Sequence, residues 1–124
     1  MKMLLLNVWD NELKIVDANS LEDYYKFIRC DCIDIVRRKI GDVEVEIICD
    51  DEGLLIDKPK VSAIDVDGTP ALFGNLLIAG GKVIDGELTE LTTEEVFEIM
   101  NNVAEITTSV YKEPFRVFVE MDYC

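Results

Sequence analysis

The sequence predicts an α+β fold with a mainly antiparallel, curled β-sheet and two packed α-helices. Three observations lead to this prediction. Apolar and acidic residues alternate along residues 43–49, which is the period of a strand with one buried face. Apolar residues recur at helical spacing over 21–28 and again over 92–106. Short apolar runs between glycine, proline and aspartate fill much of the remaining chain, as in a sheet with many turns.

The first elements are predicted to be a hairpin and a helix. Residues 3–9 and 12–18 have the composition of two strands joined at Asp10-Asn11, a pair that suits a tight turn. Asn19 or Ser20 then caps a short helix with acidic residues in its first turn. Its aromatic face is expected to pack on the sheet.

A second hairpin is predicted from residues 33–40 and 43–49, divided by Gly41-Asp42. In the second strand the valines and Ile47 point one way and two glutamates point the other, so we expect one buried and one solvated face. Further short strands are expected where apolar runs meet turn residues, at 53–56, 61–66 and 75–78, bounded by Pro59, Asp67–Pro70 and Gly80-Gly81.

The last predicted helix follows Leu91. Thr92 and Glu95 have the spacing of a capping box, in which each side chain bonds the other residue's backbone. Residues 115–121 are rich in strand-forming types and are expected to return to the sheet. The predicted apolar stripe of the helix is Val96, Phe97, Met100, Val103, Ala104 and Ile106, and its outer face carries Glu94, Glu95, Glu98 and Glu105.

The middle of the chain resembles a known family. The alternating strand runs into the acidic turn Asp50-Asp51-Glu52-Gly53, and about twenty residues later Gly74-Asn75 opens an apolar strand. This layout, over residues 20–81, resembles a small domain of unknown function carried mainly by bacteriophages, other mobile elements and Gram-positive bacteria. The resemblance implies a family and no activity.

Size and charge narrow the classes of function. The 124 residues, 49% of them hydrophobic, suit one domain over 1–124 that buries a core without disulfides or a metal. The net charge of −14 disfavours nucleic acid and anionic membranes, since phosphate contacts need clustered Lys and Arg, and favours a basic protein surface as partner. No apolar run approaches the roughly 20 residues of a membrane span, so we expect a cytoplasmic protein.

Catalysis and metal binding are not expected. The chain contains no histidine, which removes the usual general base and the Ser-His-Asp arrangement. The four cysteines, Cys30, Cys32, Cys49 and Cys124, lack zinc-site spacing and are expected to be buried or incidental thiols. The Asp50-Asp51-Glu52 segment could attract a hard cation but is better explained as a solvated turn. We therefore predict no cofactor, no metal and no enzyme.

Two functions of different classes remain open. The first is an acidic protein–protein interaction module or inhibitor that docks on a basic surface of a host or defence factor. Short edge strands also leave self-association open. The residues expected to form the acidic interaction surface are Glu44, Glu46, Asp50, Asp51, Glu52, Glu94, Glu95 and Glu98.

The second function is sequestration of a small phosphorylated ligand such as a nucleotide signal. Guanidinium groups clamp phosphates and aromatic rings stack on bases. Arg37 with Arg29, or Arg38 with Arg116, could form such a clamp, unless these arginines simply pair with nearby carboxylates. A third alternative is an accessory phage protein. The candidate ligand-binding residues are Arg29, Arg37, Arg38, Lys39, Tyr24 and Tyr25.

Overall fold

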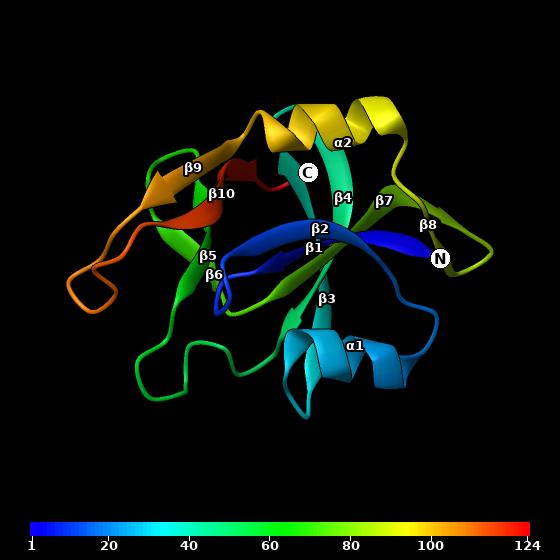
Figure 1. The fold of residues 1–124 in the computed structure, drawn as a ribbon. Coiled ribbons are helices and arrows are strands. Elements are labelled where there is room, and N and C mark those ends of the chain that lie inside the picture. The colour runs from blue at the N-terminus through cyan, green and yellow to red at the C-terminus, as the bar shows by residue number, and fades with distance from the viewer.

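The computed structural model describes all 124 residues as a ten-stranded sheet with two helices (Figure 1). Strands hold 49% of the residues and helices 13%. The elements are β1 (Lys2–Asn7), β2 (Glu12–Asp17), α1 (Leu21–Ile28), β3 (Ile33–Ile40), β4 (Val43–Asp50), β5 (Val61–Asp65), β6 (Pro70–Phe73), β7 (Leu76–Ile84), β8 (Glu87–Thr89), α2 (Thr93–Met100), β9 (Val103–Ile106) and β10 (Phe115–Asp122).

The sheet is mixed and open. Its strand order is β2-β1-β7-β4-β3-β10-β5-β6, with β8 on β7 and β9 on β10. β10 runs parallel to β5, with Phe118 opposite Ala63. The prediction of a mainly antiparallel, curled sheet is therefore wrong. Alternation and turn residues indicate hairpins between neighbouring segments, whereas β5 and β10 are remote in sequence and meet only through tertiary packing.

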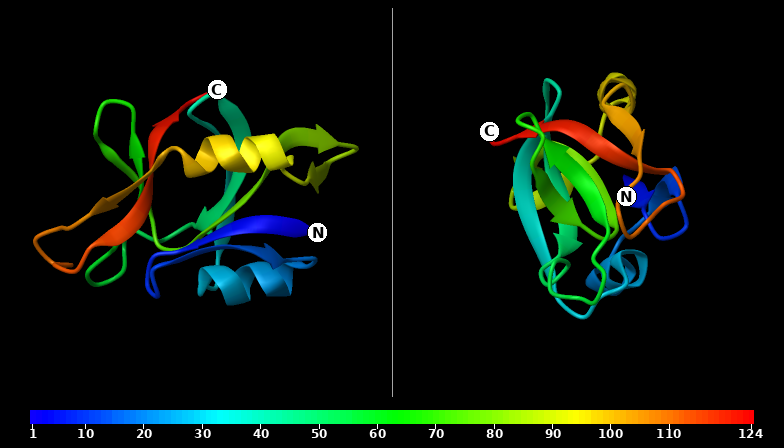
Figure 2. Two further views of the ribbon diagram at one scale, coloured as in Figure 1. Left: turned by 45° about the horizontal axis from the view of Figure 1, so that its top comes forward. Right: turned by 90° about the vertical axis from the view of Figure 1, so that its left-hand side faces the viewer.

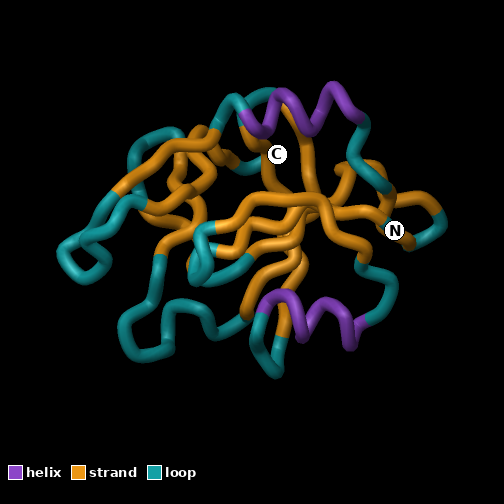
Figure 3. The backbone as a smooth tube through the Cα atoms, viewed as in Figure 1, coloured by secondary structure: helices purple, strands orange, loops and turns teal.

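Both faces of the central strands are covered, because α1 and α2 lie on opposite sides of the sheet (Figures 1 and 3). Val45 and Ile47 of β4 face the larger core cluster, while Ile48 faces a second cluster that includes Ile28 of α1. Glu46 is only 8% exposed. The expected solvated face of this strand is therefore largely buried, and the prediction is wrong there.

The start of α1 confirms its predicted cap. Ser20 Oγ accepts a hydrogen bond of 3.2 Å from the backbone N–H of Asp23. The helix ends at Arg29, which adopts a left-handed φ of +65°. Ile28 is the fully buried side chain, and the helix's aromatic residues are only half-buried against the second cluster.

The start of α2 confirms the capping box. Glu95 N donates to Thr92 Oγ1 at 3.1 Å, and Thr92 N donates to Glu95 Oε1 at 2.8 Å. The predicted length and stripe are wrong, because residues 103–106 form β9 and pair with β10. Ile99 is the buried residue of the helix, while Phe97 is 68% exposed. These later residues form their backbone hydrogen bonds with β10 instead of continuing the helix.

The middle strands differ from the prediction at two points. Residues 53–56 form turns, and a side chain at Gly53 would meet the carbonyl oxygen of Phe73. Gly80 and Gly81 lie inside β7 rather than ending it, because they let neighbouring backbones approach closely. The pairing of β7 with β8 is irregular here, since its register shifts between Gly80 and Ile84. β6, β8 and β9 were not predicted as strands.

Candidate functional site

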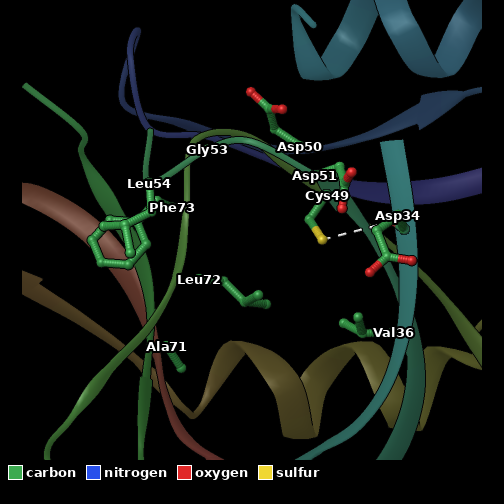
Figure 4. A pocket seen from close by; sticks show the side chains of 10 residues that line it. All are labelled: Asp34, Val36, Cys49, Asp50, Asp51, Gly53, Leu54, Ala71, Leu72 and Phe73. Carbon is green, nitrogen blue, oxygen red and sulfur yellow. Dashed lines mark hydrogen bonds between the residues drawn. The ribbon is translucent and has the colours of Figure 1, made fainter. Parts of the chain in front are cut away.

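A groove opens where β3 and β10 diverge. β10 pairs with β3 only at Ile40 and Lys39, so residues 33–38 have β4 as their only neighbouring strand. Figure 2 shows the two strands separating on this side of the molecule. The space between β3 and β6 is a cavity of about 200 Å³, which we call the β3–β6 groove. It is lined by Asp34, Val36, Cys49, Asp50, Asp51, Gly53, Leu54, Ala71, Leu72 and Phe73 (Figure 4).

The floor of the groove is apolar because it continues the main core. Strand alternation places Val36 of β3 and Cys49 of β4 on the face that carries the larger cluster. Leu72 of β6 approaches from the other wall, and its side chain points across the groove toward Val36 (Figure 4). Side chains from the β3–β4 hairpin and from the β5–β6 hairpin therefore form the floor together.

The rim of the groove is acidic. Asp34, Asp50 and Asp51 line it, no lysine or arginine does, and none of the three aspartates forms an ion pair. Asp34 Oδ1 accepts a hydrogen bond from Ile35 N at 2.9 Å, and Asp50 Oδ1 accepts one from Glu52 N at 2.9 Å. These local bonds orient two carboxylates but leave their charges uncompensated.

Exposed apolar side chains extend the groove outward. The turn after β4 carries Leu54, Leu55 and Ile56, which are 60%, 80% and 40% exposed. Three consecutive apolar side chains in water beside an acidic rim are unusual for a turn without a partner. The groove and this turn together offer both apolar contact and negative charge.

The thiol at the floor reports the same environment. Burial, aided by the negative charges of Asp34, Asp50 and Asp51 and opposed by Arg38, raises the pKa of Cys49 to about 12. Burial likewise raises the pKa of Cys30 to about 11, with Asp50 contributing. Both thiols are protonated at neutral pH and therefore poor nucleophiles.

Arg37 is occupied by the protein's own acceptors. Its Nη1 donates to Glu46 Oε1 at 3.0 Å and to the Gly81 carbonyl at 2.6 Å, and its Nη2 donates to Glu44 Oε2 at 2.9 Å. These contacts raise the pKa of Arg37, chiefly through the hydrogen bond to Glu46. Arg37 therefore pairs with nearby carboxylates, which was the alternative to phosphate binding. Its partners, Glu44 and Glu46, both belong to the predicted acidic surface.

The other arginines lie apart from Arg37. Arg29 Nη2 donates to Asp10 at 2.6 Å, at the turn between β1 and β2. Arg38 is on the opposite face of β3, as predicted, with its guanidinium 4.4 Å from the ring centroid of Tyr123. Arg116 is the second residue of β10 and donates to the backbone of the β1–β2 turn, so the structure forms no paired arginine clamp.

Lys39 and the two tyrosines are also separate from one another. Lys39 lies in a hollow with Lys82, but three carboxylates share this hollow. Tyr24 and Tyr25 are half-buried on α1, and burial raises the pKa of Tyr24. No basic residue of the predicted ligand site therefore faces an aromatic residue of that site. The carboxylates of the hollow belong to Asp42, Glu44 and Glu95.

The predicted acidic surface divides into two groups. Glu44 lies near the start of β4, in the hollow that also includes Glu95 of α2. Asp50 ends the same strand, and Asp51 and Glu52 follow it. Six residue steps along β4 separate Glu44 from Asp50, which is about 20 Å. Of the second group, Asp50 and Asp51 line the groove.

The sequence reasoning missed Asp34, Val36 and the β6 wall as site residues. Alternation along β3 does place Asp34 and Val36 on one face, so that signal was present. The position of Leu72 opposite them has no local signal. The Gly74-Asn75 step is structural, since Asn75 is fully buried and its side chain bonds both β1 and α1 through Val8 N and Phe27 O.

The residues contain no group of three or more cysteine, aspartate or glutamate side chains placed to hold a metal ion. Neither helix has the length and apolar character needed to cross a bilayer.

The comparisons with known proteins give one match. The model of a family described as "Domain of unknown function (DUF3846)" matches residues 1–104, a wider span than residues 20–81. No curated protein matches the chain. No solved structure matches it either.

Proposed function

We propose that this chain, which belongs to the DUF3846 family of domains of unknown function, is a non-enzymatic protein that binds a basic segment of another protein. The observation that carries the proposal is the β3–β6 groove, where three aspartates without cationic partners surround an apolar floor. A lysine or arginine side chain matches both features, because its stem is apolar and its end is charged.

The size of the groove supports a side chain as the ligand. Its volume of about 200 Å³ lies below the range of roughly 300–1,000 Å³ that is typical of small-molecule sites. A nucleotide would also place its phosphates against Asp34, Asp50 and Asp51, with no cation to neutralise them. Arg37 already forms ion pairs with Glu44 and Glu46. This pairing further favours binding of a protein over binding of a phosphorylated ligand.

The cellular setting is part of the same proposal. We place the protein in the cytoplasm of bacteria that carry phages or mobile elements. We assign partner binding to the acidic Asp50-Asp51-Glu52-Gly53 turn. The partner is a basic surface of a host or defence factor. The absence of histidine and the protonated state of Cys49 at neutral pH support binding rather than catalysis.

A fluorescence anisotropy titration tests the proposal. The probe is the labelled heptapeptide Thr-Lys-Thr-Val-Thr-Lys-Thr, and the control peptide has glutamate in place of both lysines. We expect at least tenfold tighter binding of the lysine peptide, weakening as salt rises because exposed charges are screened. Equal binding of the two peptides, or no binding of the lysine peptide at about 1 mM, would overturn the proposal.

A pair of charge-matched variants locates the site. The groove variant combines Asp34→Asn, Asp50→Asn and Asp51→Asn, and the asparagines keep the local hydrogen-bond acceptors. We expect about tenfold weaker binding, since three exposed ion pairs contribute roughly 0.2–1 kcal/mol each. A control variant with the same net charge should change binding less than threefold, and equal losses in both variants would exclude the groove. The control substitutions are Asp85→Asn, Glu87→Gln and Glu105→Gln, all at exposed positions outside the groove.

A further inference from the structure

The outer edge of β3 is free along most of its length. Only Ile40 and Lys39 pair with β10, so residues 33–38 offer backbone groups on the groove side to no other strand. Six residues of strand span about 20 Å. An unpaired edge of this length is a template for another strand.

The register shows which residues carry the free groups. Ile40 and Val43 flank the two-residue turn Gly41-Asp42 and form the first hydrogen-bonded pair of the hairpin. Even-numbered residues of β3 therefore bond β4, in agreement with the bond from Asp51 N to Cys32 O. The N–H and C=O groups of residues 33, 35 and 37 point away from β4, toward the open side.

Two of these free groups are capped by adjacent side chains. Ile35 N donates to Asp34 Oδ1 at 2.9 Å, and the Arg37 carbonyl accepts from Arg38 Nη1 at 2.7 Å. Asp34 precedes Ile35 and Arg38 follows Arg37, so each capping side chain belongs to a neighbouring residue. Either side chain can rotate away without breaking the β3–β4 hydrogen bonds. The N–H of Ile35 and the carbonyl of Arg37 therefore have hydrogen-bond partners when no strand is added. They become available to an added strand when the two side chains rotate away.

We propose that the basic segment binds as an added strand on the free edge of β3. This inference rests on the proposed function and specifies its partner as an extended chain. Side chains two residues apart on such a strand would enter the groove together. A basic one would meet Asp34, Asp50 and Asp51, and an apolar one would pack between Val36 and Leu72.

Charge decides between a basic segment and a second copy of this chain. Each copy carries −14, and pairing two β3 edges would bring two acidic rims together. A basic segment reverses this repulsion. The occupant is therefore a lysine- or arginine-containing extended segment of another protein.

Backbone methylation of the heptapeptide probe tests strand addition with the unmodified protein. One methylated peptide carries N-methyl groups on the lysines and valine, and the other carries them on the inner threonines. Alternate N–H groups of a paired strand point to its neighbour, so one methylated peptide should lose at least tenfold in affinity while the other keeps it. If the unmodified peptide binds and both methylated peptides bind equally well, strand addition is wrong and the proposed function stands. If the unmodified peptide does not bind, the proposed function itself fails.

A proline variant tests the protein side of the same contact. Ile35→Pro removes an N–H that no strand of the protein uses, and proline is tolerated at such edge positions. We expect at least tenfold weaker peptide binding. Ile35→Thr also changes the side chain but keeps the N–H, so its loss of affinity should be much smaller than that of Ile35→Pro. Unchanged binding by a folded Ile35→Pro variant would overturn the inference. A dimer in solution that Ile35→Pro converts to a monomer would also overturn it, because a second copy would then occupy the edge.

Discussion

The buried amide of Asn75 is predicted to be one of the most important polar side chains for stability. It lies fully buried at the start of β7. Its Oδ1 accepts from Val8 N at 2.9 Å and its Nδ2 donates to the carbonyl of Phe27 at 3.0 Å. One side chain thus joins the end of β1, the last turn of α1 and the first residues of β7.

The substitution Asn75→Ala should cost about 2–4 kcal/mol of unfolding free energy. It leaves the buried N–H of Val8 without an acceptor, which costs about 1–3 kcal/mol. The Phe27 carbonyl is partly buried, and its loss falls near the lower end of the same range. The total is a large part of the 5–15 kcal/mol that stabilises a typical domain.

Asn75→Asp separates hydrogen bonding from cavity formation. It keeps the acceptor for Val8 but removes the donor to Phe27 and buries a negative charge. The pKa of such a carboxyl is raised in the folded state, so its protonated form is the more stable one. The destabilisation should therefore shrink as pH falls through the folded pKa toward the unfolded value near 4, where the acid can donate to Phe27.

Urea unfolding followed by the fluorescence of Trp9, the only tryptophan, measures both variants. Asn101→Ala is the matched control, since Asn101 is exposed and its loss should cost less than about 0.5 kcal/mol. A loss below 1 kcal/mol for Asn75→Ala, or an Asn75→Asp deficit that does not shrink in acid, would refute the reasoning.

Three further predictions follow from the polar and ionisable groups. Arg37→Ala should lower the urea midpoint of unfolding more than Lys14→Ala does, because the Glu46 side chain, 11% exposed, loses its only cation. An effect no larger than that of Lys14→Ala would contradict this. Because the pKa of Cys49 is raised to about 12, its contribution to stability is fully present below pH 9 and should fall by about 1.4 kcal/mol per pH unit as pH rises from 9 toward 12. Cys30, with a pKa raised to about 11, adds a fall of the same sign, so in unfolding curves at pH 8 to 11 Cys49→Ala should reduce the slope without abolishing it. Ser62→Ala should be neutral or stabilise by up to about 1 kcal/mol in thermal unfolding, since Ser62 Oγ is buried without a hydrogen-bond partner, and a loss above 1 kcal/mol would show that a partner exists.

Local elements of this fold could be predicted because their determinants lie within a few residues. Gly41 adopts a φ of +60°, which glycine allows at little cost, and the two-residue turn it forms sets the whole β3–β4 register. The Thr92–Glu95 capping box and the Ser20 cap satisfy backbone N–H groups of their own helices. Such hydrogen bonds form whatever the rest of the chain does.

The end of α2 shows where local reasoning failed. Residues 103–106 have apolar positions compatible with a helix, but β10 supplies a partner strand for them. The paired residues lie 9 to 15 positions apart, and such pairing is not encoded in the periodicity of either segment alone. Ile99 became the buried residue because the shortened helix packs on β4 in a different rotation from the predicted one.

In the candidate site, too, residue type could be predicted from the sequence, whereas the grouping of residues in space could not. The sequence reasoning named Asp50 and Asp51 because they are acidic, but it grouped them with residues such as Glu44, which lies about 20 Å from Asp50 along β4. It also grouped Arg29 with Arg37, which bind different carboxylates in different parts of the fold. Closeness in sequence was a poor guide to closeness in space.

By itself the sequence determined the acidic charge, the caps, the turn residues and the alternation of β3 and β4, since these depend on residue type and on contacts a few positions apart. Only the tertiary structure decided that β10 lies parallel to β5 and leaves β3 after two paired residues. That divergence opens the β3–β6 groove and frees the edge of β3. The physical reason is that strand order depends on how the two core clusters pack together, a sum over many distant contacts that no local pattern contains.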